Sequence, residues 1–389
     1  MMKNRVAIIF LMLWSSKVYF NGNETNLNKF FKNGNIRFVR EFAISEDSQF
    51  GRFYFENPNS LAIDADGEIY VCDGEANNIK KFNTEGKFIK NIGKTGSGPG
   101  ELGLPDLLEV SRDRLAVWEW SNRRISIMTL EGEFIKGFRF SDQEGLPVKI
   151  RILSGGQIVI ELEKTSFSDP KYPQECRIDL YSSDMEFLKT IYSRRYLRAK
   201  PIMKPRVSVP QPFGPCIQWA VSPEGKVVIG YSAEYEIEVF NPLDGKAFSF
   251  SHEYIPVRVI DKDKEGHFSK FVVKEFNADG TTRIRKGAPH YILNNTEFPK
   301  FKSAFDSIIV DSEGNIWIHV YDKNRDNLYF DVFDKRGKYI NHVKIHGIDG
   351  FPNGRSRLSG NSLWQIETDQ NGLYRVVKYN ISGCSAVQL

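Results

Sequence analysis

A paired hairpin that recurs along the chain constrains the fold most strongly. Each repeat has an apolar stretch, a tight polar turn and a second apolar stretch, and then a second hairpin of the same kind. The turns are rich in Asp, Ser, Glu and Gly, as tight hairpins require. The first hairpins cover residues 61–73, 108–120, 151–163, 219–231 and 308–320, and the second ones cover 78–92, 124–138, 177–191, 236–250 and 329–343. Four strands repeated every 40 to 50 residues or so are typical of a propeller blade.

A sixth unit has only three strands of its own, within residues 361–381. Residues 35–45 have strand character and no hairpin partner, so we expect them to supply the fourth strand and to remove two open sheet edges. The predicted fold is therefore all-β: a six-bladed β-propeller of four-stranded antiparallel blades over residues 35–381. The expected blades are about 58–93, 105–140, 147–192, 215–252, 302–345, and 357–381 with 35–45.

The first blade carries a family resemblance. Its sequence, "FENPNSLAIDADGEIYVCDGEANNIKKFNTEGKFIKNIGKTGSGPGELGLP", resembles an NHL repeat. The chain from about Asn35 to Ile381 is similar to exported bacterial six-bladed propeller proteins. This resemblance implies the propeller fold and a ligand-facing surface at the top of the ring.

The glycine-rich stretch from Gly93 to Pro105 contains Gly-Lys-Thr but is not predicted to bind nucleotide phosphates. A phosphate-binding P-loop needs a glycine five positions before that tripeptide, and Phe88 occupies this position. We interpret the stretch as the connection from the first blade to the second.

The N-terminus predicts export. Lys3 and Arg5 precede nine apolar residues, 6–14, which is short for a membrane span and typical of a secretory leader. We expect a leader over residues 1–22, a periplasmic or extracellular location and no membrane span in the mature chain; an uncleaved anchor stays an alternative. Without residues 1–20 the net charge falls from +4 to +1, since Lys3, Arg5 and Lys17 are lost. Export argues against a nucleic-acid partner.

No motif in the sequence predicts a metal site. The cysteines are too widely spaced for a zinc cage, and we expect buried free thiols. Asp-rich turns at 64–67, 277–280 and 311–314 lack the glutamate of a calcium loop and read as hairpin turns. His342 and His346 would lie roughly 13 Å apart on one strand, too far to share an ion. The cysteines are Cys72, Cys176, Cys216 and Cys384.

Two segments interrupt the blade pattern. Residues 193–215 carry six cations and no acid, so they form either a solvated connection or a patch for an anionic ligand such as an acidic glycan, phosphate or carboxylate. The ligand-binding candidates in this basic segment are Arg194, Arg195, Arg198 and Lys200; Lys204 and Arg206 are the other cations.

The second segment, residues 253–300, is predicted to be a helical insertion between blades four and five. There a possible Asp261 N-cap precedes a helical stripe of Phe268, Phe271, Val272 and Phe276.

The starts of the inner strands give the remaining site candidates: Asn59, Asp106, Lys149, Gln218, Asp306 and Arg357. Two acids, two amides and two bases make a poor cation site. We therefore predict a monomeric module that binds a protein, an anionic small molecule or a glycan, with no cofactor and no assigned catalytic residue. The alternative is a metal-dependent propeller enzyme of the lactonase or lyase type, which alone would need a divalent cation; no H-E-x-x-H or G-x-S-x-G motif is present.

Overall fold

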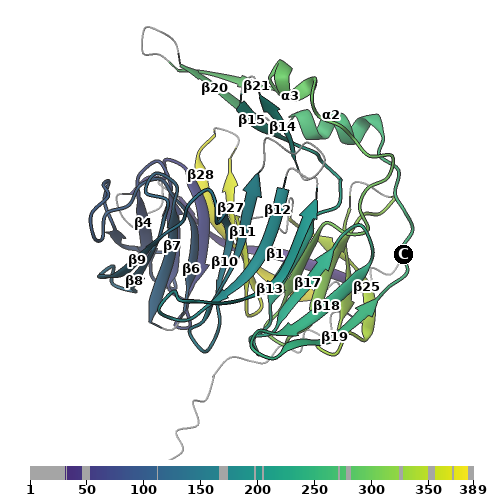
Figure 1. Cartoon of the computed structure of the whole chain (residues 1–389), viewed down its shortest axis with the longest axis horizontal. Helices are drawn as coiled ribbons and strands as arrows, with labels where there is room; N and C mark the ends of the chain where they lie inside the picture. Colours follow the sequence, from purple (N-terminus) through teal and green to yellow (C-terminus); the bar gives the residue numbers. More distant parts are fainter. Residues whose placement is uncertain are drawn as a thin grey trace, which may run out of the picture.

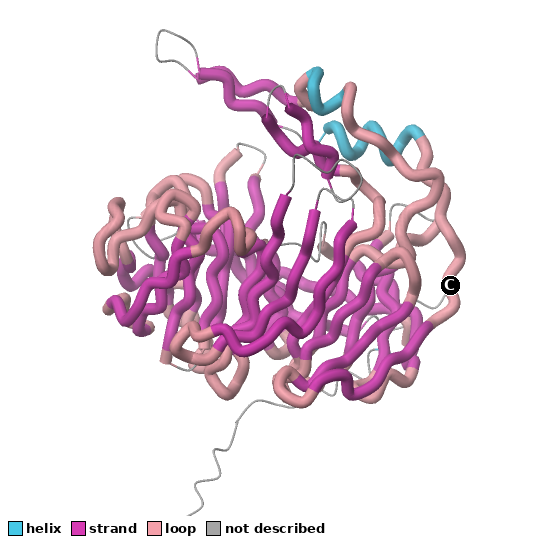
Figure 2. The backbone as a smooth tube through the Cα atoms, in the orientation of Figure 1, coloured by secondary structure: helices cyan, strands magenta, loops and turns pink. Residues whose placement is uncertain are grey.

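The computed structural model (Figure 1) describes most of the chain beyond the N-terminal segment. The described residues are 31, 33–45, 53–111, 113–165, 174–196, 199–203, 206–269, 272–276, 282–323, 327–348, 355–369 and 372–383. Strands dominate them (Figure 2), so the all-β prediction is confirmed.

The strands form six antiparallel units of four strands in the described part of the chain. Blade 1 holds β2 (Pro58–Ile63), β3 (Ile69–Asp73), β4 (Asn78–Phe82) and β5 (Phe88–Ile92); blade 2 holds β6 (Pro105–Val110), β7 (Arg114–Glu119), β8 (Arg124–Thr129) and β9 (Phe134–Arg139). Blade 3 holds β10 (Leu146–Ile152), β11 (Ile158–Thr165), β12 (Gln174–Tyr181) and β13 (Phe187–Tyr196); blade 4 holds β16 (Ile217–Val221), β17 (Val227–Tyr231), β18 (Glu236–Asn241) and β19 (Gly245–Ser251). Blade 5 holds β22 (Ser307–Val310), β23 (Ile316–Val320), β24 (Leu328–Phe333) and β25 (Tyr339–His346).

The sixth unit combines both ends of the described chain. It holds β26 (Ser356–Ser359), β27 (Ser362–Thr368), β28 (Tyr374–Gly383) and β1 (Asn35–Ser45). Strand β1 pairs antiparallel with β28 from Ile36 opposite Gly383 to Ser45 opposite Arg375. Its first residues also pair in parallel with the end of β25, so that blades 5 and 6 share one eight-stranded sheet.

The Asp-rich turns close hairpins. In blade 1 the Asp64 carboxylate accepts backbone N–H bonds from Asp66 and Glu68, and Gly67 takes the left-handed conformation at φ +84°. Blade 5 repeats the arrangement at Asp311 and Gly314. These carboxylates are therefore occupied by the turn, as a hairpin requires. The third such turn, residues 277–280, lies outside the described residues.

The hydrophobic core is divided among the contacts between neighbouring blades. For example, Trp118 of blade 2 packs with Ile160 of blade 3, and Trp219 of blade 4 packs with Ile178 of blade 3. Similar clusters join blade 1 to 2, 4 to 5, 5 to 6, and 6 to 1. Every blade thus has a buried face on each side, and each inner strand faces the axis.

The stretch from Gly93 to Pro105 connects β5 to β6, as predicted, and a buried ion pair holds it. Arg124 contacts Glu119 at 2.9 Å, and both side chains are almost fully buried. Arg124 also donates to the carbonyl oxygens of Ser97 and Glu101, while Glu119 accepts the N–H of Gly103. The loop is therefore a fixed part of blade 2.

Both interrupting segments contain a hairpin that was not predicted. The basic segment folds partly as a hairpin, β14 (Ala199–Met203) with β15 (Arg206–Pro210). The insertion has helix α2 (Asp261–Ser269), a second hairpin of β20 (Val272–Phe276) with β21 (Thr282–Lys286), and the short helix α3 (His290–Leu293). The expected helical stripe through Phe276 is wrong, because Val272–Phe276 is extended; Phe271 lies outside the described residues, and Asp261 is already within the helix rather than before it.

These added elements lie together beyond one end of the blades (Figure 1). Both segments connect an outer strand to the next inner strand, which places them at the end where inner strands begin. No helix in the described residues is long and apolar enough to cross a membrane. Cys72 and Cys176 are buried free thiols and Cys216 is a half-buried one, in keeping with the prediction; Cys384 is outside the described residues.

Deleting residues 35–45 should expose the edge of β28 and lower stability, because β28 would lose its antiparallel partner and Phe38 and Ile44 would leave two inter-blade cores. Thermal unfolding and size-exclusion chromatography test this, with a protein that begins at residue 25 as the control. A deletion protein that stays monomeric and melts like the control would contradict the role of β1.

Replacing Glu119 by Ala should cost about 3–5 kcal/mol of unfolding free energy, because Arg124 would stay buried without its carboxylate. The matched control is Glu224→Ala, which removes a carboxylate that is 46% exposed and pairs with Lys226 and Lys335. We expect at most about 1 kcal/mol from such a surface pair. Equal losses in urea unfolding of the two variants would show that the buried pair does not hold the loop.

Candidate functional site

A cavity of about 660 Å³ lies among the inner strands of the propeller. Residues of β6, β10, β16, β22 and β26 line it, and Ser60 of β2 completes the circuit of six blades. Its volume is within the range of small-molecule sites. The lining reaches the turns after the inner strands, at Ser154, Ser222, Asp311 and Gly360. The cavity therefore extends away from the end that carries the two inserted hairpins.

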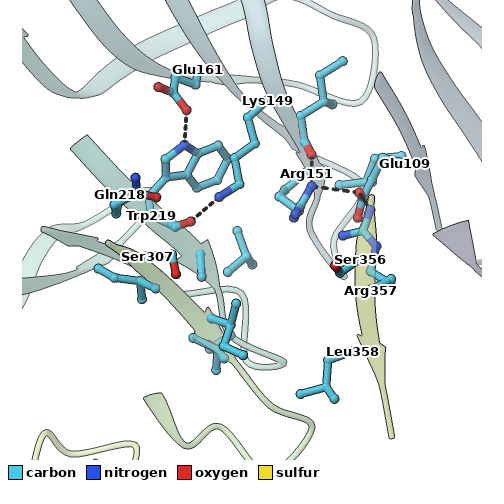
Figure 3. A pocket seen from close by; sticks show the side chains of 18 of the residues that line it. Glu109, Lys149, Arg151, Glu161, Gln218, Trp219, Ser307, Ser356, Arg357 and Leu358 are labelled. Carbon is cyan, nitrogen blue, oxygen red and sulfur yellow. Dashed lines mark hydrogen bonds and ion pairs between the residues drawn. The ribbon is translucent and has the colours of Figure 1, made fainter. Parts of the chain in front are cut away.

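Three cationic side chains enter this cavity from two inner strands (Figure 3): Lys149 and Arg151 of β10, and Arg357 of β26. Lys149 and Arg151 share a face because alternate residues of a strand point the same way. Arg357 is more than 200 positions away in the sequence and reaches the same space through the ring. The positive charge of the cavity therefore comes from residues that lie far apart in the sequence.

Glu109 of β6 lies between the two guanidinium groups. Its Oε2 accepts bonds from Arg357 at 2.7 Å and from Arg151 at 3.2 Å. Glu109 is 12% exposed, and Arg151 and Arg357 are 28% and 20% exposed. Burial, followed by the charge of Arg357, lowers the pKa of Arg151 to about 10. The single Glu109 carboxylate therefore pairs with two guanidinium groups, so the repulsion between Arg151 and Arg357 is only partly offset.

Lys149 has a different environment. Its Nζ donates to the backbone oxygen of Trp219 and lies 4.8 Å from the centroid of the indole ring. The nearby Glu161 carboxylate accepts from Trp219 Nε1 at 2.8 Å and from the Cys176 thiol at 3.5 Å. Burial inside the propeller, and next the charge of Arg151, lower the pKa of Lys149 from 10.5 to about 7.

Two uncharged polar side chains also line the cavity. Gln218 donates from Nε2 to the Cys216 sulfur at 3.1 Å. Ser307 has a buried hydroxyl with no hydrogen-bond partner among the described residues. A buried hydroxyl without a partner is costly, so a ligand or water that contacts Ser307 Oγ would be stabilised there.

Of the six predicted inner-strand residues, the structure brings together Lys149, Gln218 and Arg357. The other three make structural bonds. Asn59 donates to the carbonyl oxygen of Pro105, and Asp106 accepts from the indole N–H of Trp120. Asp306 accepts from the Tyr321 hydroxyl at 2.7 Å and lies 3.1 Å from His319 Nδ1.

Strand irregularities explain two of these three residues, Asn59 and Asp106. The pairing of β2 with β3 shifts between Pro58 and Ser60, and that of β6 with β7 shifts between Pro105 and Leu108. A shift of one residue turns a side chain to the other face, so Ser60 lines the cavity in place of Asn59. Sequence reasoning missed Arg151 and Glu109, although the alternation from Lys149 would have found Arg151.

The basic segment does not line the cavity in the described residues. Arg194 and Arg195 are exposed near the end of β13, and the Arg194 guanidinium lies 3.7 Å from the Tyr231 ring centroid. Lys200 and Arg206 belong to the hairpin β14–β15, but their side chains are not described, and Arg198 and Lys204 lie outside the described residues. The predicted patch for an anionic ligand at this segment stays a prediction.

Lys149→Met should make the protein more stable at pH 6 and nearly as stable as the wild type at pH 10. Lys149 has a pKa of about 7 when folded and 10.5 as an unperturbed side chain, so between these values the unfolded chain binds more protons and wild-type stability rises with pH. We expect the free energy of unfolding to rise at pH 6 by at least about 1.4 kcal/mol, which corresponds to a shift of one unit in the pKa of Lys149. Urea unfolding at both pH values measures it. If Lys149→Met changed stability equally at pH 6 and pH 10, the pKa of Lys149 would not be lowered in the folded protein.

Comparisons with known proteins agree on the fold. A family described as "6-bladed beta-propeller" matches residues 53–104, which hold blade 1 and its connection to blade 2. NHL repeat-containing protein 3 from Homo sapiens is 26% identical over 111 residues, which cover 27% of this chain and 32% of that protein. The mouse protein is 25% identical over the same extent. The match thus spans about a third of the length of these relatives.

Solved structures extend the likeness to most of the chain. A protein from Bacteroides fragilis is 12% identical, with a TM-score of 0.50 over 90% of this chain and 99% of that one. A gluconolactonase from Xanthomonas campestris is 12% identical, with a TM-score of 0.42 over 88% of this chain and 98% of that one. The second likeness is too distant to bear on activity. The family match and the first of these structures show that this chain has a β-propeller fold, and 111 of its residues are similar in sequence to an NHL-repeat protein.

Proposed function

We propose that this propeller is a binding module whose central cavity takes a small anionic ligand with a carboxylate or phosphate group. The observation that carries the proposal is the convergence of Lys149, Arg151 and Arg357 on one cavity, where Glu109 is the only carboxylate that forms an ion pair with any of them among the described residues. Burial first, and then the charge of Arg357, lowers the pKa of Arg151, and an anion there would offset both effects. Arginine favours planar, bidentate partners of this kind.

The proposed cellular setting rests on the sequence alone. The basic start and apolar run of residues 3–14 support export with a leader over residues 1–22. The pairing of β1 with β28 supports a closed six-bladed ring and, with it, a monomer that has no open blade edge. In such a ring the cavity would be held open by blades that pack on both sides.

The alternative of a metal-dependent lactonase or lyase has less support. A divalent cation does not suit the cavity, because three cationic side chains enter it and its acids already have partners. Glu109 binds two arginines, Glu161 binds Trp219, and Asp311 accepts from Trp317 and Asn315. Among the described residues no three His, Cys, Asp or Glu side chains form a candidate metal group. Metal analysis of the purified protein tests this alternative.

Arg357→Met should weaken binding of the anion at least tenfold, because a charge-assisted hydrogen bond is worth about 1.5–3 kcal/mol. Isothermal titration at low salt with inorganic phosphate, acetate and glucuronate measures it, and added salt should weaken wild-type binding. The matched control is Arg336→Met, an exposed arginine in the turn of blade 5.

A second variant separates the cavity from the basic segment. Replacing Arg194, Arg195 and Arg198 by Ser should leave binding to the cavity unchanged. If none of the anions binds the wild type, or if this triple variant loses binding while Arg357→Met keeps it, the cavity is not the anion site.

A further inference from the structure

Lys149 is the one cation of the cavity that has no carboxylate within ion-pair distance among the described residues. Its amine donates to the Trp219 carbonyl and lies 4.8 Å from the centroid of the Trp219 ring. Glu161 could have been its partner, but that carboxylate is engaged by the indole N–H and by Cys176. A protonated amine has three N–H donors, and here one carbonyl oxygen accepts.

This environment disfavours the charged amine. A methionine or leucine would fill the space beside Trp219 without removing an ammonium from bulk water. The titratable groups that share the cavity are Arg151 of β10, Glu109 of β6, Glu161 of β11, Arg357 of β26, and Asp311 after β22. Burial, and next the positive charge of Arg151, lower the pKa of Lys149 to about 7. A large part of the amine is therefore neutral, and nucleophilic, near pH 7.

We propose that Lys149 Nζ captures the carbonyl group of a small oxo acid as a reversible imine, while Arg151 and Arg357 bind the carboxylate of the same molecule. The inference rests on the proposed anion site and names its ligand class. The arrangement (Figure 3) places an amine and two guanidinium groups around one space, with Ser307 on its wall. An oxo acid matches both features, since it joins an electrophilic carbon to an anion.

The reaction needs no further reactant. The amine lone pair attacks the carbonyl carbon, the C–N bond forms, and the π electrons move to the oxygen. A proton passes from nitrogen to that oxygen and gives a carbinolamine. The nitrogen then loses its second proton as the C–O bond breaks, and the oxygen leaves as water. The product is an imine between Lys149 and the oxo acid, and hydrolysis returns both.

Reductive trapping tests the proposal. The full chain is incubated with pyruvate and sodium cyanoborohydride, and the products are analysed by intact mass and peptide mapping. We expect one dominant adduct at Lys149, with a mass gain equal to pyruvic acid less one oxygen atom. Trapping should rise from pH 6 to pH 8 as the amine loses its proton.

Five comparisons make the test specific. Lys149→Met should lose the adduct, and Lys149→Arg, which keeps a cation and a donor for Trp219, should lose it too. Lys338→Met, at an exposed lysine in the blade 5 turn, should keep it. Propanal, which has a carbonyl but no carboxylate, should be trapped at Lys149 at least tenfold more slowly, and Arg357→Met should slow trapping of pyruvate but not of propanal.

The outcomes are distinguishable from those of the binding experiment. If pyruvate binds the wild type by titration but Lys149 gains no adduct, or exposed lysines react at the same rate, the covalent step is wrong and the anion site stands. If phosphate, acetate or glucuronate binds but pyruvate neither binds nor reacts, the oxo-acid ligand is wrong and the anion site stands. If none of these anions binds and pyruvate does not react, both the anion site and the covalent step are wrong. Loss of the adduct in Lys149→Arg with an unchanged circular dichroism spectrum would exclude misfolding as the cause.

Discussion

Packing between neighbouring blades is the interaction on which the rest of the structure depends. A four-stranded sheet has two apolar faces here, so no blade can bury both of them alone. Each blade covers one face with the preceding blade and the other with the following one. Leu61 and Trp364 illustrate the contact between blades 1 and 6, in the cluster that brings the last blade of the chain against the first.

This packing turns the inner strands toward a common axis. Polar side chains that are buried near this axis lose hydration, which costs free energy unless they find hydrogen-bond partners. The fold satisfies most of them with local partners, as Glu161 does with the Trp219 indole and Glu109 does with two arginines. Lys149 and Ser307 are less well satisfied. Groups that a fold keeps without full compensation are the natural places to look for a ligand.

The two inserted segments show where reasoning from the pattern was weak. A short apolar run such as Val272–Phe276 suits a strand as well as a helix, and only the pairing with Thr282–Lys286 decides between them. The basic segment was predicted as a solvated connection or an anion-binding patch, and neither prediction included the pairing of Ala199–Met203 with Arg206–Pro210. In both cases the deciding contact is the pairing with a hairpin partner. For Val272–Phe276 the predicted turn at residues 277–280 already indicated that partner.

The sequence by itself determined the hairpin repeat, because turn residues such as Asp64 and Gly67 act locally and need only their own strands. It also indicated β1 as a strand without a neighbour, which the structure pairs with β28. Only the tertiary structure decided which side chains meet at the axis. Bulges near Pro58 and Pro105 moved Asn59 and Asp106 out of the cavity, and these shifts depend on pairing with the next strand. Lys149 and Arg357 line the same cavity because the packed blades bring distant inner strands around one space. Local sequence patterns act over a few residues and cannot show which distant strands come together.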